Sequence, residues 1–452
     1  MDRTLVKDST KLVDKKVRML GRIQTIRDHG KITFVDLVDE TGPIQCVLKQ
    51  KIDLLEGDFL EIEGIVKKRP KELVNENLET GTVEVAVEGA KVISKAKPAP
   101  IPTDGDGYDI EEALRLRWRF LDLRRARLQK NLRLRAKAAI LAREYLNKEG
   151  FVEVETPYLS KTTPEGARDF LVPSRLHLGK FYALAQAPQQ YKQLLMLSGF
   201  EKYFQFARAF RDEDLRADRQ FEHTQIDIEA AYVNREDILK AVEGLATFVT
   251  EGMKKKIYKK PFPVFTYKET MEKFKQDKFD MREKKDKDTL AFAWVVDFPL
   301  LEYDEKEKRY TFSHNPFTAP KEKFVDDLMK LANLDKIESY QYDLVLNGEE
   351  IGSGSIRITN PQIQRQVFTA MGYSDKKIDS DFGHLLEAYE YGAPTHGGIA
   401  LGFDRFCAVL AGEKSIREVI AFPTSGSGQT SVMDAPSEVD DTIIADLGIK
   451  KR

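Results

Sequence analysis

The sequence predicts an α+β protein with two domains, a small N-terminal β-barrel and a larger domain that mixes helices and strands. Residues 16–97 contain five short runs in which apolar and polar residues alternate, the period that strands have in a sheet. A stretch rich in proline and glycine follows within 98–115 and predicts a hinge. From residue 116 to residue 452, helical spacing and strand alternation occur in turn, and this length can bury a large core of its own.

Composition and charge exclude several kinds of protein. The chain carries 72 Lys and Arg against 74 Asp and Glu, which argues against a polybasic coat dedicated to nucleic acid. Its two cysteines, Cys46 and Cys407, lie far apart, so no disulfide framework and no Cys-x-x-Cys metal site can form. The first residues lack the apolar segment of a secretory signal, and no apolar run reaches the roughly 18 residues of a membrane span. These features predict a cytoplasmic protein without membrane contact.

The alternating runs at the N-terminus predict a barrel of the OB type, a fold that commonly binds single-stranded nucleic acid on one face. In the second run, Thr33, Val35 and Leu37 are expected to face the core, which turns Phe34 outward. In the third run, the apolar positions leave Gln45 on the outside. An exposed ring beside an arginine and an amide can stack on an unpaired base. The expected strands are 17–21, 31–37, 43–48, 59–67 and 83–87.

A polar floor is predicted in the larger domain, where two alternating runs between residues 204 and 229 flank a charged loop. When these runs pair as a hairpin, Arg211 shares one face with Gln225, Asp227 and Glu229 of the second run. Small alanines on the first run leave room beside the arginine. Because a guanidinium presents a planar fork to phosphate or carboxylate, this face suits a substrate with a polyphosphate and a charged head group.

The same stretch resembles a known family. Its sequence FRDEDLRADRQ, followed by TQIDIE, is similar to motif 2 of the class II aminoacyl-tRNA synthetases, and most closely to that of the bacterial-type aspartyl-tRNA synthetases. The resemblance implies that Arg211 grips the α-phosphate of ATP and the carboxylate of the amino acid, and that Glu213 and Gln220 hold ATP. His223 stands where the family has an adenine-stacking phenylalanine, and an imidazole can also stack. The larger domain is then expected to be a class II synthetase catalytic domain, built on a mainly antiparallel sheet flanked by helices.

Two further stretches resemble the other motifs of this family. The predicted helix that stops at Gly150, followed by a strand that ends at Pro157, is similar to motif 1, which implies a homodimer. The sequence GGIALGFDR at 397–405 is similar to motif 3, where Arg405 is implied to pack on adenine and to reach the γ-phosphate. The implied ATP contacts are Arg211, Glu213, Gln220, His223, Glu350, Gly402, Phe403, Asp404 and Arg405, with Arg211 and Arg405 as the catalytic residues.

The resemblance also implies a pocket for the amino acid. Lys192 matches the lysine that pairs with the aspartate side chain, Asp227 is expected to orient it, and Arg357 matches the arginine that forks onto the same carboxylate. Lys192 and Arg357 together would create a doubly cationic pocket that selects aspartate over asparagine. Beside His314 stands Asn315, where the family has a second histidine. The implied aspartate contacts are Glu165, Gln189, Lys192, Arg211, Asp227, His314 and Arg357.

Two acidic residues, Asp343 and Glu350, lie on predicted strands on either side of Gly348. Carboxylate oxygens are the ligands that Mg²⁺ prefers, and this ion commonly bridges protein carboxylates and nucleotide phosphates. The pair therefore predicts a Mg²⁺ site beside ATP.

The barrel is expected to contact the anticodon of a tRNA, because several of its residues match family positions that face it. His29 matches a position that tends to be leucine in enzymes restricted to tRNA(Asp) and histidine in enzymes that also charge tRNA(Asn). This match supports the hypothesis of a relaxed tRNA choice. The implied anticodon contacts are Arg27, His29, Phe34, Gln45 and Arg69.

Together these features define the expected domains and activity. We expect an OB-fold anticodon-binding domain at 1–97, a hinge at 98–115 and a catalytic domain at 116–452. The extra domain that bacterial relatives carry between motifs 2 and 3 is expected to be reduced to a short connector near 254–290. The expected activity is ATP-dependent aspartate–tRNA ligation, with tRNA(Asp) and, hypothetically, tRNA(Asn) as partners. The alternatives are an asparaginyl- or lysyl-type synthetase, or a synthetase-derived protein that no longer charges tRNA, such as an amide-forming enzyme or a nucleic-acid-binding regulator.

Overall fold

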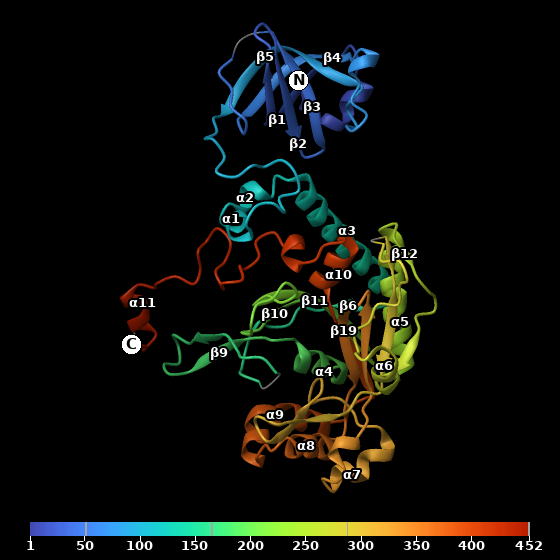
Figure 1. The fold of residues 1–452 in the computed structure, drawn as a ribbon. Coiled ribbons are helices and arrows are strands. Elements are labelled where there is room, and N and C mark those ends of the chain that lie inside the picture. Colours follow the sequence, from blue (N-terminus) through green and yellow to red (C-terminus); the bar gives the residue numbers. More distant parts are fainter. Residues whose placement is uncertain (50–51, 164–165, 287, 451–452) are drawn as a thin grey trace. The chain divides into compact units, whose positions relative to one another are not determined.

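The computed structural model describes residues 1–49, 52–163, 166–286 and 288–450. The chain separates into two compact units, Met1–Asp104 and Gly105–Arg452 (Figure 1). The boundary falls in the segment where the sequence predicts a hinge. Within the described residues, no helix is long and apolar enough to cross a membrane.

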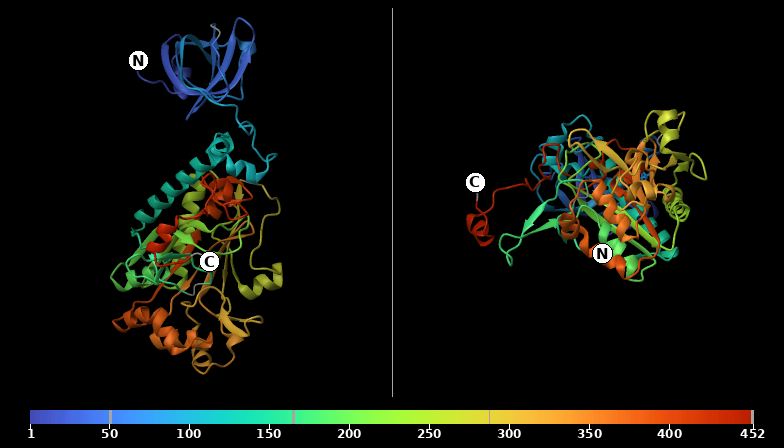
Figure 2. Two further views of the ribbon diagram at one scale, coloured as in Figure 1. Left: turned by 90° about the vertical axis from the view of Figure 1, so that its left-hand side faces the viewer. Right: turned by 90° about the horizontal axis from the view of Figure 1, so that it is seen from below.

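The first unit is a closed five-stranded barrel, which confirms the prediction (Figure 2). Its strands follow one another around the barrel in the order β1-β2-β3-β5-β4. Val35 and Leu37 are buried, while Phe34 and Gln45 lie on the outer side and are only half-buried. Thr33, which was expected inside, is also only half-buried because it is the first residue of its strand. The elements are β1 (Lys16–Asp28), β2 (Thr33–Asp39), β3 (Gly42–Leu48), β4 (Phe59–Lys68) and β5 (Val83–Ser94), with the 3-10 turns η1 (Val6–Lys11) and η2 (Lys71–Leu73).

The second unit is built on an eight-stranded sheet in the order β13-β15-β18-β19-β20-β11-β10-β6. Neighbouring strands are antiparallel except at the edges, where β13 pairs with β15 and β6 pairs with β10 in parallel. A mainly antiparallel sheet is what the sequence predicts for this domain. The sheet contains β6 (Val152–Glu153), β10 (Lys202–Phe210), β11 (Glu222–Ala231), β13 (Val264–Thr266), β15 (Phe292–Val296), β18 (Gln341–Leu346), β19 (Glu349–Ile356) and β20 (His396–Gly402). The smaller sheets are formed by β7 (Leu159–Ser160), β8 (Leu171–Pro173), β9 (Phe181–Leu184), β12 (Lys256–Ile257), β14 (Thr289–Leu290), β16 (Leu301–Asp304) and β17 (Arg309–Phe312).

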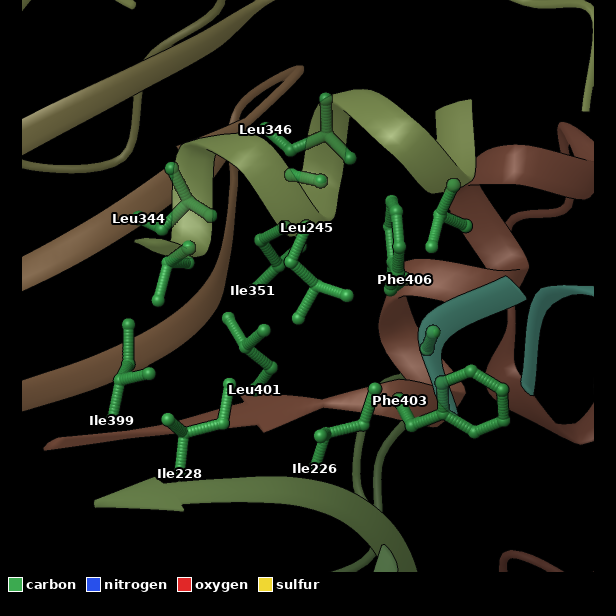
Figure 3. Close-up of a cluster of buried hydrophobic side chains, with 14 of the residues drawn as sticks. Ile226, Ile228, Leu245, Leu344, Leu346, Ile351, Ile399, Leu401, Phe403 and Phe406 are labelled. Carbon is green, nitrogen blue, oxygen red and sulfur yellow. The ribbon is translucent and has the colours of Figure 1, made fainter. Parts of the chain in front are cut away.

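Helices α3, α5 and α10 cover one face of this sheet and bury the main apolar core (Figure 3). Ile226 and Ile228 of β11 point into this core, together with Leu344, Ile399 and Leu401 from other strands. Full burial of one such side chain stabilises the fold by about 1.5–3 kcal/mol. The helices are α1 (Glu112–Arg117), α2 (Arg119–Asp122), α3 (Ala126–Lys148), α4 (Gln189–Leu197), α5 (Arg235–Gly252), α6 (Tyr267–Phe274), α7 (Val325–Met329), α8 (Pro361–Ala370), α9 (Asp375–Glu390), α10 (Phe403–Ala411) and α11 (Asp441–Asp446), with the 3-10 turns η3 (Glu322–Phe324), η4 (Leu334–Lys336) and η5 (Ile416–Val419).

The opposite face of the sheet carries polar residues. Because side chains alternate along a strand, Gln225, Asp227 and Glu229 point away from the core that the isoleucines of β11 enter. The register pairs Gln205 with Asp227 and Ala207 with Gln225, so the polar positions of β10 and β11 lie on one side. Helix α4 packs against both strands. The predicted hairpin and its polar floor are thus confirmed.

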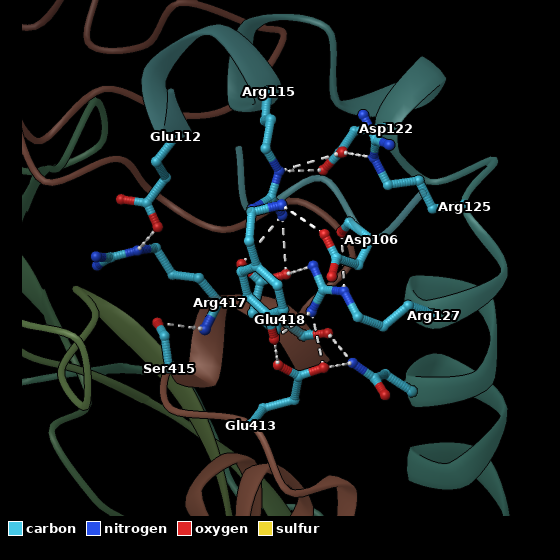
Figure 4. A network of polar contacts seen from close by, with 12 residues as sticks. Asp106, Glu112, Arg115, Asp122, Arg125, Arg127, Glu413, Ser415, Arg417 and Glu418 are labelled. Atoms are coloured by element: carbon cyan, nitrogen blue, oxygen red, sulfur yellow. Dashed lines mark hydrogen bonds and ion pairs between the residues drawn. The ribbon is translucent and has the colours of Figure 1, made fainter. Parts of the chain in front are cut away.

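A buried ion network fastens the start of the second unit to the segment that follows α10 (Figure 4). Asp122 accepts hydrogen bonds from Arg115 at 3.2 Å and from Arg125 at 2.7 Å. Arg115 and Arg127 both donate to Glu418, at 2.9 and 2.8 Å. Buried pairs of this kind hold geometry more than they add stability, because desolvation offsets their attraction. The network holds η5 in place, and the first residue of η5 lines the cavity described below.

The connector, residues 254–290, contains more structure than predicted. It supplies helix α6 and the edge strand β13 of the main sheet. Phe279 is buried in an apolar cluster with Phe265 and Phe274, and the rings of Phe274 and Phe279 stack with centroids 4.0 Å apart. These aromatic residues give an otherwise charged segment a small core of its own, which explains the difference.

Candidate active site

A cavity of about 310 Å³ opens on the polar face of the sheet, between the β10–β11 loop, β19 and the start of α10. Its lining brings together residues that lie far apart in the sequence. His314, which is predicted to bind the amino acid, is one of them. The residues predicted to bind ATP that line it are Arg211, Glu213, Gln220, His223, Glu350, Gly402, Asp404 and Arg405.

Arg211 follows directly after β10, where the hairpin opens into its loop. Its backbone N–H donates to the carbonyl of Phe221 at 2.7 Å and closes that loop. On the same face of β10, Ala207 and Ala209 are buried and small, which leaves space beside the guanidinium. Among the described residues, none forms a hydrogen bond or ion pair with the Arg211 side chain. Within the part of the chain that the structure describes, the guanidinium is therefore free to receive an anion.

Three other cations at the cavity are each held by a carboxylate. Each of these pairs is partly exposed, so water screens the attraction and the pair contributes little to stability. An incoming anion can take over such a cation at small cost. The pairs are Arg219–Glu213 at 2.9 Å, Arg405–Asp218 at 3.1 Å and Lys278–Glu350 at 2.9 Å.

The turn from β20 into α10 places Arg405 at the start of a helix, as the sequence predicts. One terminal nitrogen of Arg405 donates to the backbone carbonyl of Glu350, while its Nε is buried without a partner in the described chain. Asp404 accepts a hydrogen bond from the backbone N–H of Thr224 at 2.8 Å and so ties α10 to β11. Asp404 thus holds the walls of the cavity together.

Phe403, one of the residues predicted to contact ATP, does not line the cavity with its side chain. Its ring is buried in the apolar core (Figure 3). There it meets Phe206 edge-on, with ring centroids 5.2 Å apart. Successive residues of a helix project about 100° apart, so Phe403 and Arg405 face nearly opposite directions. Phe403 therefore faces the core, while Arg405, two residues later, faces the cavity.

Both histidines at the cavity are neutral near pH 7. Burial, together with the charge of Arg211, lowers the pKa of His223 to about 3. Burial and the charge of Arg357 lower the pKa of His314 to about 3. The Nδ1 of His314 lies 3.0 Å from the hydroxyl of Ser353. A neutral imidazole can stack on a flat ring or form hydrogen bonds, but it adds no positive charge to the site.

Further along the same face of β11 lies a buried ion network of four side chains, Lys192, Asp227, Glu229 and Arg357, each at most 1% exposed. Lys192 on α4 donates to Asp227 at 2.9 Å, the contact that the sequence predicts, and lies 3.4 Å from Glu229. Arg357 donates two hydrogen bonds to the carboxylate of Glu229, at 2.8 and 3.0 Å, and one to the hydroxyl of Ser355 at 2.7 Å. We call this group the β11 network.

In the β11 network, both cations that are predicted to bind aspartate already have carboxylate partners. Glu229 takes the fork of Arg357 that was expected to face substrate, so the two cations are balanced by two carboxylates. Burial alone would raise the pKa of Glu229, but Arg357 and Lys192 hold that pKa below its ordinary value, and the carboxylate stays ionised. Two charges of each sign, out of water, stabilise one another only as a complete set.

Gln189 and Glu165 are the two remaining residues that the sequence predicts to contact the amino acid. Gln189 begins α4 and shares its buried side with Lys192, but its amide donates to Gln193 at 2.9 Å. Glu165 lies outside the described residues.

Asp343 and Glu350 come from the neighbouring strands β18 and β19, as predicted. Burial and the negative charge of Glu350 raise the pKa of Asp343 well above its usual range. Burial would raise the pKa of Glu350 too, but Lys278 lowers it overall. Two repelling carboxylates, one of them at the cavity, fit a Mg²⁺ ion that takes its other ligands from water and phosphates. Among the described residues, no cluster of three or more potential metal ligands occurs, so the protein would supply a minority of the ligands.

On the barrel, most of the predicted anticodon contacts lie together on the outer side of β1, β2 and β3. Arg27 forms two hydrogen bonds with the carboxylate of Asp36, at 2.7 and 2.9 Å, and one with Gln45 at 3.3 Å. The ring of His29 meets Phe34 edge-on, with centroids 5.5 Å apart. The ring of Phe34 is therefore supported on one side by His29 rather than being isolated on the surface.

Arg69 differs from the other predicted anticodon contacts. Its side chain is only 6% exposed and donates to the backbone carbonyl of Val83 at 3.1 Å. It also lies 3.8 Å from Glu84, whose carboxylate accepts a hydrogen bond from Gln45. In this conformation Arg69 supports β5 and, through Glu84, the amide of Gln45.

Reasoning from the sequence missed Lys278, which lines the cavity from the connector. It stands in a charged run without periodicity, so nothing distinguishes it from the neighbouring lysines. The available signal was the apolar Phe279 beside it, because a buried ring in such a run fixes the adjacent side chain against the body of the domain.

Two family models match the chain. Residues 111–426 match the tRNA synthetases class II (D, K and N), and residues 17–93 match the OB-fold nucleic acid binding domain. The first match spans the main sheet, the cavity and the β11 network. The second spans the barrel.

The chain is similar to known proteins over nearly its whole length. It is 39% identical to the aspartate–tRNA(Asp/Asn) ligase of Thermoanaerobacter sp. (strain X514), over 97% of this chain and 96% of that protein. It is 36% identical to the aspartate–tRNA ligase of Staphylococcus carnosus (strain TM300), over 98% of this chain and 97% of that protein. The first alignment runs over 574 positions, more than the 452 residues here, so that relative carries a sizeable segment without a counterpart in this chain.

Solved structures share the fold. The asparaginyl-tRNA synthetase from Pyrococcus horikoshii complexed with asparaginyl-adenylate matches with a TM-score of 0.74, over 94% of this chain and 98% of that chain, at 22% identity. A putative aspartyl-tRNA synthetase from Leishmania major Friedlin matches with a TM-score of 0.76, over 93% and 94%, at 17% identity. At these identities the likeness concerns the fold alone, and it confirms the predicted fold class.

Proposed function

Because this chain belongs to the class II tRNA synthetases of the aspartate, lysine and asparagine group, we propose that it is an aspartate–tRNA ligase. In the first step, the α-carboxylate of aspartate attacks the α-phosphate of ATP, which gives aspartyl-adenylate and pyrophosphate. In the second step, a hydroxyl of the terminal adenosine of the tRNA takes the aspartyl group, and AMP leaves. Neither step requires a nucleophile from the protein.

The unpaired guanidinium of Arg211, which has no partner among the described residues, carries this proposal. Both reactants of the first step are anions, so a cation must contact the carboxylate and the α-phosphate together. A planar fork can do so, and it costs no reorganisation when no internal partner has to be released. Arg211 is accordingly the residue that positions the two reacting groups and stabilises the charge that builds up between them.

ATP takes the remaining walls of the cavity. Arg405 supplies positive charge at the start of α10, and the neutral ring of His223 offers a surface on which adenine stacks. Glu213 and Gln220 hold the nucleotide on the side of the hairpin loop. Mg²⁺, when bound, neutralises phosphate charge, and Asp343 and Glu350 would hold it.

The amino acid is selected at the β11 network. Lys192 has three donors and Arg357 has five, and their contacts with Asp227, Glu229 and Ser355 leave donors over for the side-chain carboxylate of aspartate. Glu229 and Asp227 act as positioning residues that keep both cations ionised and in place. An amide cannot accept from two cations as a carboxylate does, so asparagine is rejected.

The barrel at 1–97 binds the anticodon, the hinge at 98–115 links it to the catalytic domain at 116–452, and Phe34 stacks on a base. Arg27, His29 and Gln45 surround that ring. Relatives named aspartate–tRNA(Asp/Asn) ligases, together with His29, support charging of tRNA(Asn) as well as tRNA(Asp). A homodimer and a cytoplasmic location complete the proposal.

Charging assays with transcripts of tRNA(Asp) and tRNA(Asn) that differ only at the third anticodon base test this function. We expect labelled aspartate on both transcripts, and neither asparagine nor lysine on either. Strict preference for tRNA(Asp) would remove the relaxed tRNA choice and leave the ligase. Charging with asparagine or lysine would replace aspartate as the substrate, and a folded protein that charges no tRNA would point to the synthetase-derived alternative.

A further inference from the structure

Among the described residues that line the cavity, Lys278 alone comes from the connector. Its ammonium lies 2.9 Å from Oε2 of Glu350, and its side chain is 45% exposed. The group thus stands at the cavity wall with room on its open side. Its role is not explained by the reaction described above, in which Arg211 and Arg405 supply the positive charge.

Lys278 projects from a fixed point although it belongs to no helix or strand. The next residue, Phe279, is 3% exposed and stacks on Phe274. Asp280 accepts a hydrogen bond from Arg282 at 2.9 Å, and Arg282 also donates to the backbone carbonyl of Thr289 in β14 at 3.0 Å, which fastens the chain a second time. A flexible four-carbon stem on an anchored backbone lets the ammonium move between nearby oxygen atoms while the chain stays in place.

Two cations approach Glu350 from different parts of the chain. Lys278 meets its carboxylate, whereas Arg405 donates to its backbone carbonyl. Arg211, which faces the α-phosphate in the proposed reaction, comes instead from the end of β10. The phosphates beyond the α-phosphate are then expected to lie toward the positive charge of Lys278 and Arg405.

We propose that Lys278 is a further substrate-binding residue, which exchanges Glu350 for the terminal phosphates of ATP and holds the pyrophosphate that leaves. This inference rests on the proposed ATP-dependent activation of aspartate. When no nucleotide is bound, Lys278 and Glu350 balance each other's charge. A triphosphate offers several anionic oxygens, so it competes effectively with one partly exposed carboxylate.

Titration calorimetry of the full chain with ATP, pyrophosphate and AMP, in the presence of Mg²⁺, tests this assignment. For Lys278→Met we expect ATP and pyrophosphate to bind roughly tenfold to a hundredfold more weakly, because charge-assisted hydrogen bonds are lost. AMP, which lacks the terminal phosphates, is expected to bind as in the wild type. Lys278→Arg keeps the cation and is expected to bind all three ligands nearly normally.

Lys268→Met serves as the matched control. This substitution removes the same charge from the connector, but Lys268 is an exposed residue of α6 that does not line the cavity. It is expected to change none of the three affinities. Unchanged affinities in Lys278→Met would overturn the inference, as would an equal loss for AMP, which would indicate a purely structural pair. Lys278→Gln is a second variant with the same expectations should the methionine variant fail to fold. Wild-type protein that binds ATP but shows no aspartate-dependent pyrophosphate exchange would overturn the proposed ligase, a separate outcome from the binding result.

Discussion

The cavity beside Arg211 and the β11 network lie on the same face of the sheet and are built from the same chemical groups. At the cavity, the ion pairs are partly exposed, and Arg211 has no partner among the described residues. In the β11 network, each cation is matched by a carboxylate, and the four side chains are at most 1% exposed. The two regions therefore differ in how far water reaches their charged groups and in how completely their cations are paired with carboxylates.

This difference teaches how one domain can bind two anionic substrates in different ways. Exposed pairs are weak, so cations at the cavity can be released to phosphates. Removing one member of a buried pair costs about 3–5 kcal/mol, so the β11 network is held as a unit and presents a rigid template. Substitutions at the cavity should therefore act on activity, and substitutions in the network on activity and stability together.

The largest expected effect is that of Arg357→Leu. We expect aspartate-dependent pyrophosphate exchange to be abolished and the free energy of unfolding to fall by about 3–5 kcal/mol, because Glu229 is left buried without its partner. ATP affinity, measured by calorimetry, is expected to change far less. Arg365→Leu removes an arginine from an exposed pair and should leave stability nearly unchanged. Exchange close to the wild-type rate in Arg357→Leu would refute the pocket assignment, and Arg357→Lys allows the same test with a charge retained.

Unlike Arg357→Leu, the Arg211→Gln variant is expected to lose activity while its stability stays nearly unchanged. Pyrophosphate exchange should fall by roughly a hundredfold or more, because the group that faces both reactants is lost. The free energy of unfolding, measured by urea denaturation, should stay within about 0.5 kcal/mol of the wild type, since no described residue pairs with this side chain. A loss of stability as large as that of Arg357→Leu would contradict the contrast between the two regions.

A substitution in the barrel lies outside both the cavity and the β11 network. It tests whether the barrel contributes only to the tRNA step of the reaction. Phe34→Ala is expected to weaken tRNA binding by about 1–3 kcal/mol, the usual contribution of one stacked base, and to raise the KM for tRNA accordingly. Pyrophosphate exchange without tRNA should be unaffected. Phe59→Ala, which removes an exposed ring on β4, is the matched control. An equal loss in both steps would show that the division of labour between the domains is wrong.

The smallest expected effect concerns pH. The pKa of His314 is about 3 in the folded protein, against an ordinary value of 6.5. Between these two pH values the histidine is protonated in the unfolded chain but neutral in the folded chain, so protonation favours unfolding. Stability should therefore fall as the pH drops from about 6.5 toward 3. The lowered pKa of Glu229 acts in the same direction but only below its ordinary value of 4.5. Urea denaturation at pH 7 and pH 5 should thus show a smaller loss for His314→Gln than for the wild type, and equal losses would contradict the burial of this histidine.

Alternation along strands made much of this structure predictable. The period of two placed Val35 and Leu37 inside the barrel and turned Phe34 outward. It also placed Gln225, Asp227 and Glu229 on one floor, because those side chains alternate with the isoleucines of β11. Both results depend only on residues that are neighbours in the sequence.

The features that were missed depend on contacts between distant residues. Glu229 was placed on the right face, but its pairing with Arg357 joins residues 128 positions apart, and no local pattern reports it. Phe403 stands inside a recognised motif, yet its direction follows from which side of α10 meets the core. Lys278 differs from neighbouring lysines only because Phe279 beside it is buried in an apolar cluster with Val295 and Val345 of the main sheet.

The most direct test of the central claim, that cations from distant parts of the chain converge on one acidic amino acid and one nucleotide, is amino-acid-dependent ATP–pyrophosphate exchange by the wild-type protein. With aspartate we expect rapid exchange, and with asparagine or lysine, at the same concentration, exchange near the background rate. Exchange that is as fast with asparagine as with aspartate, or that is absent with all three amino acids in a folded, ATP-binding protein, would contradict it.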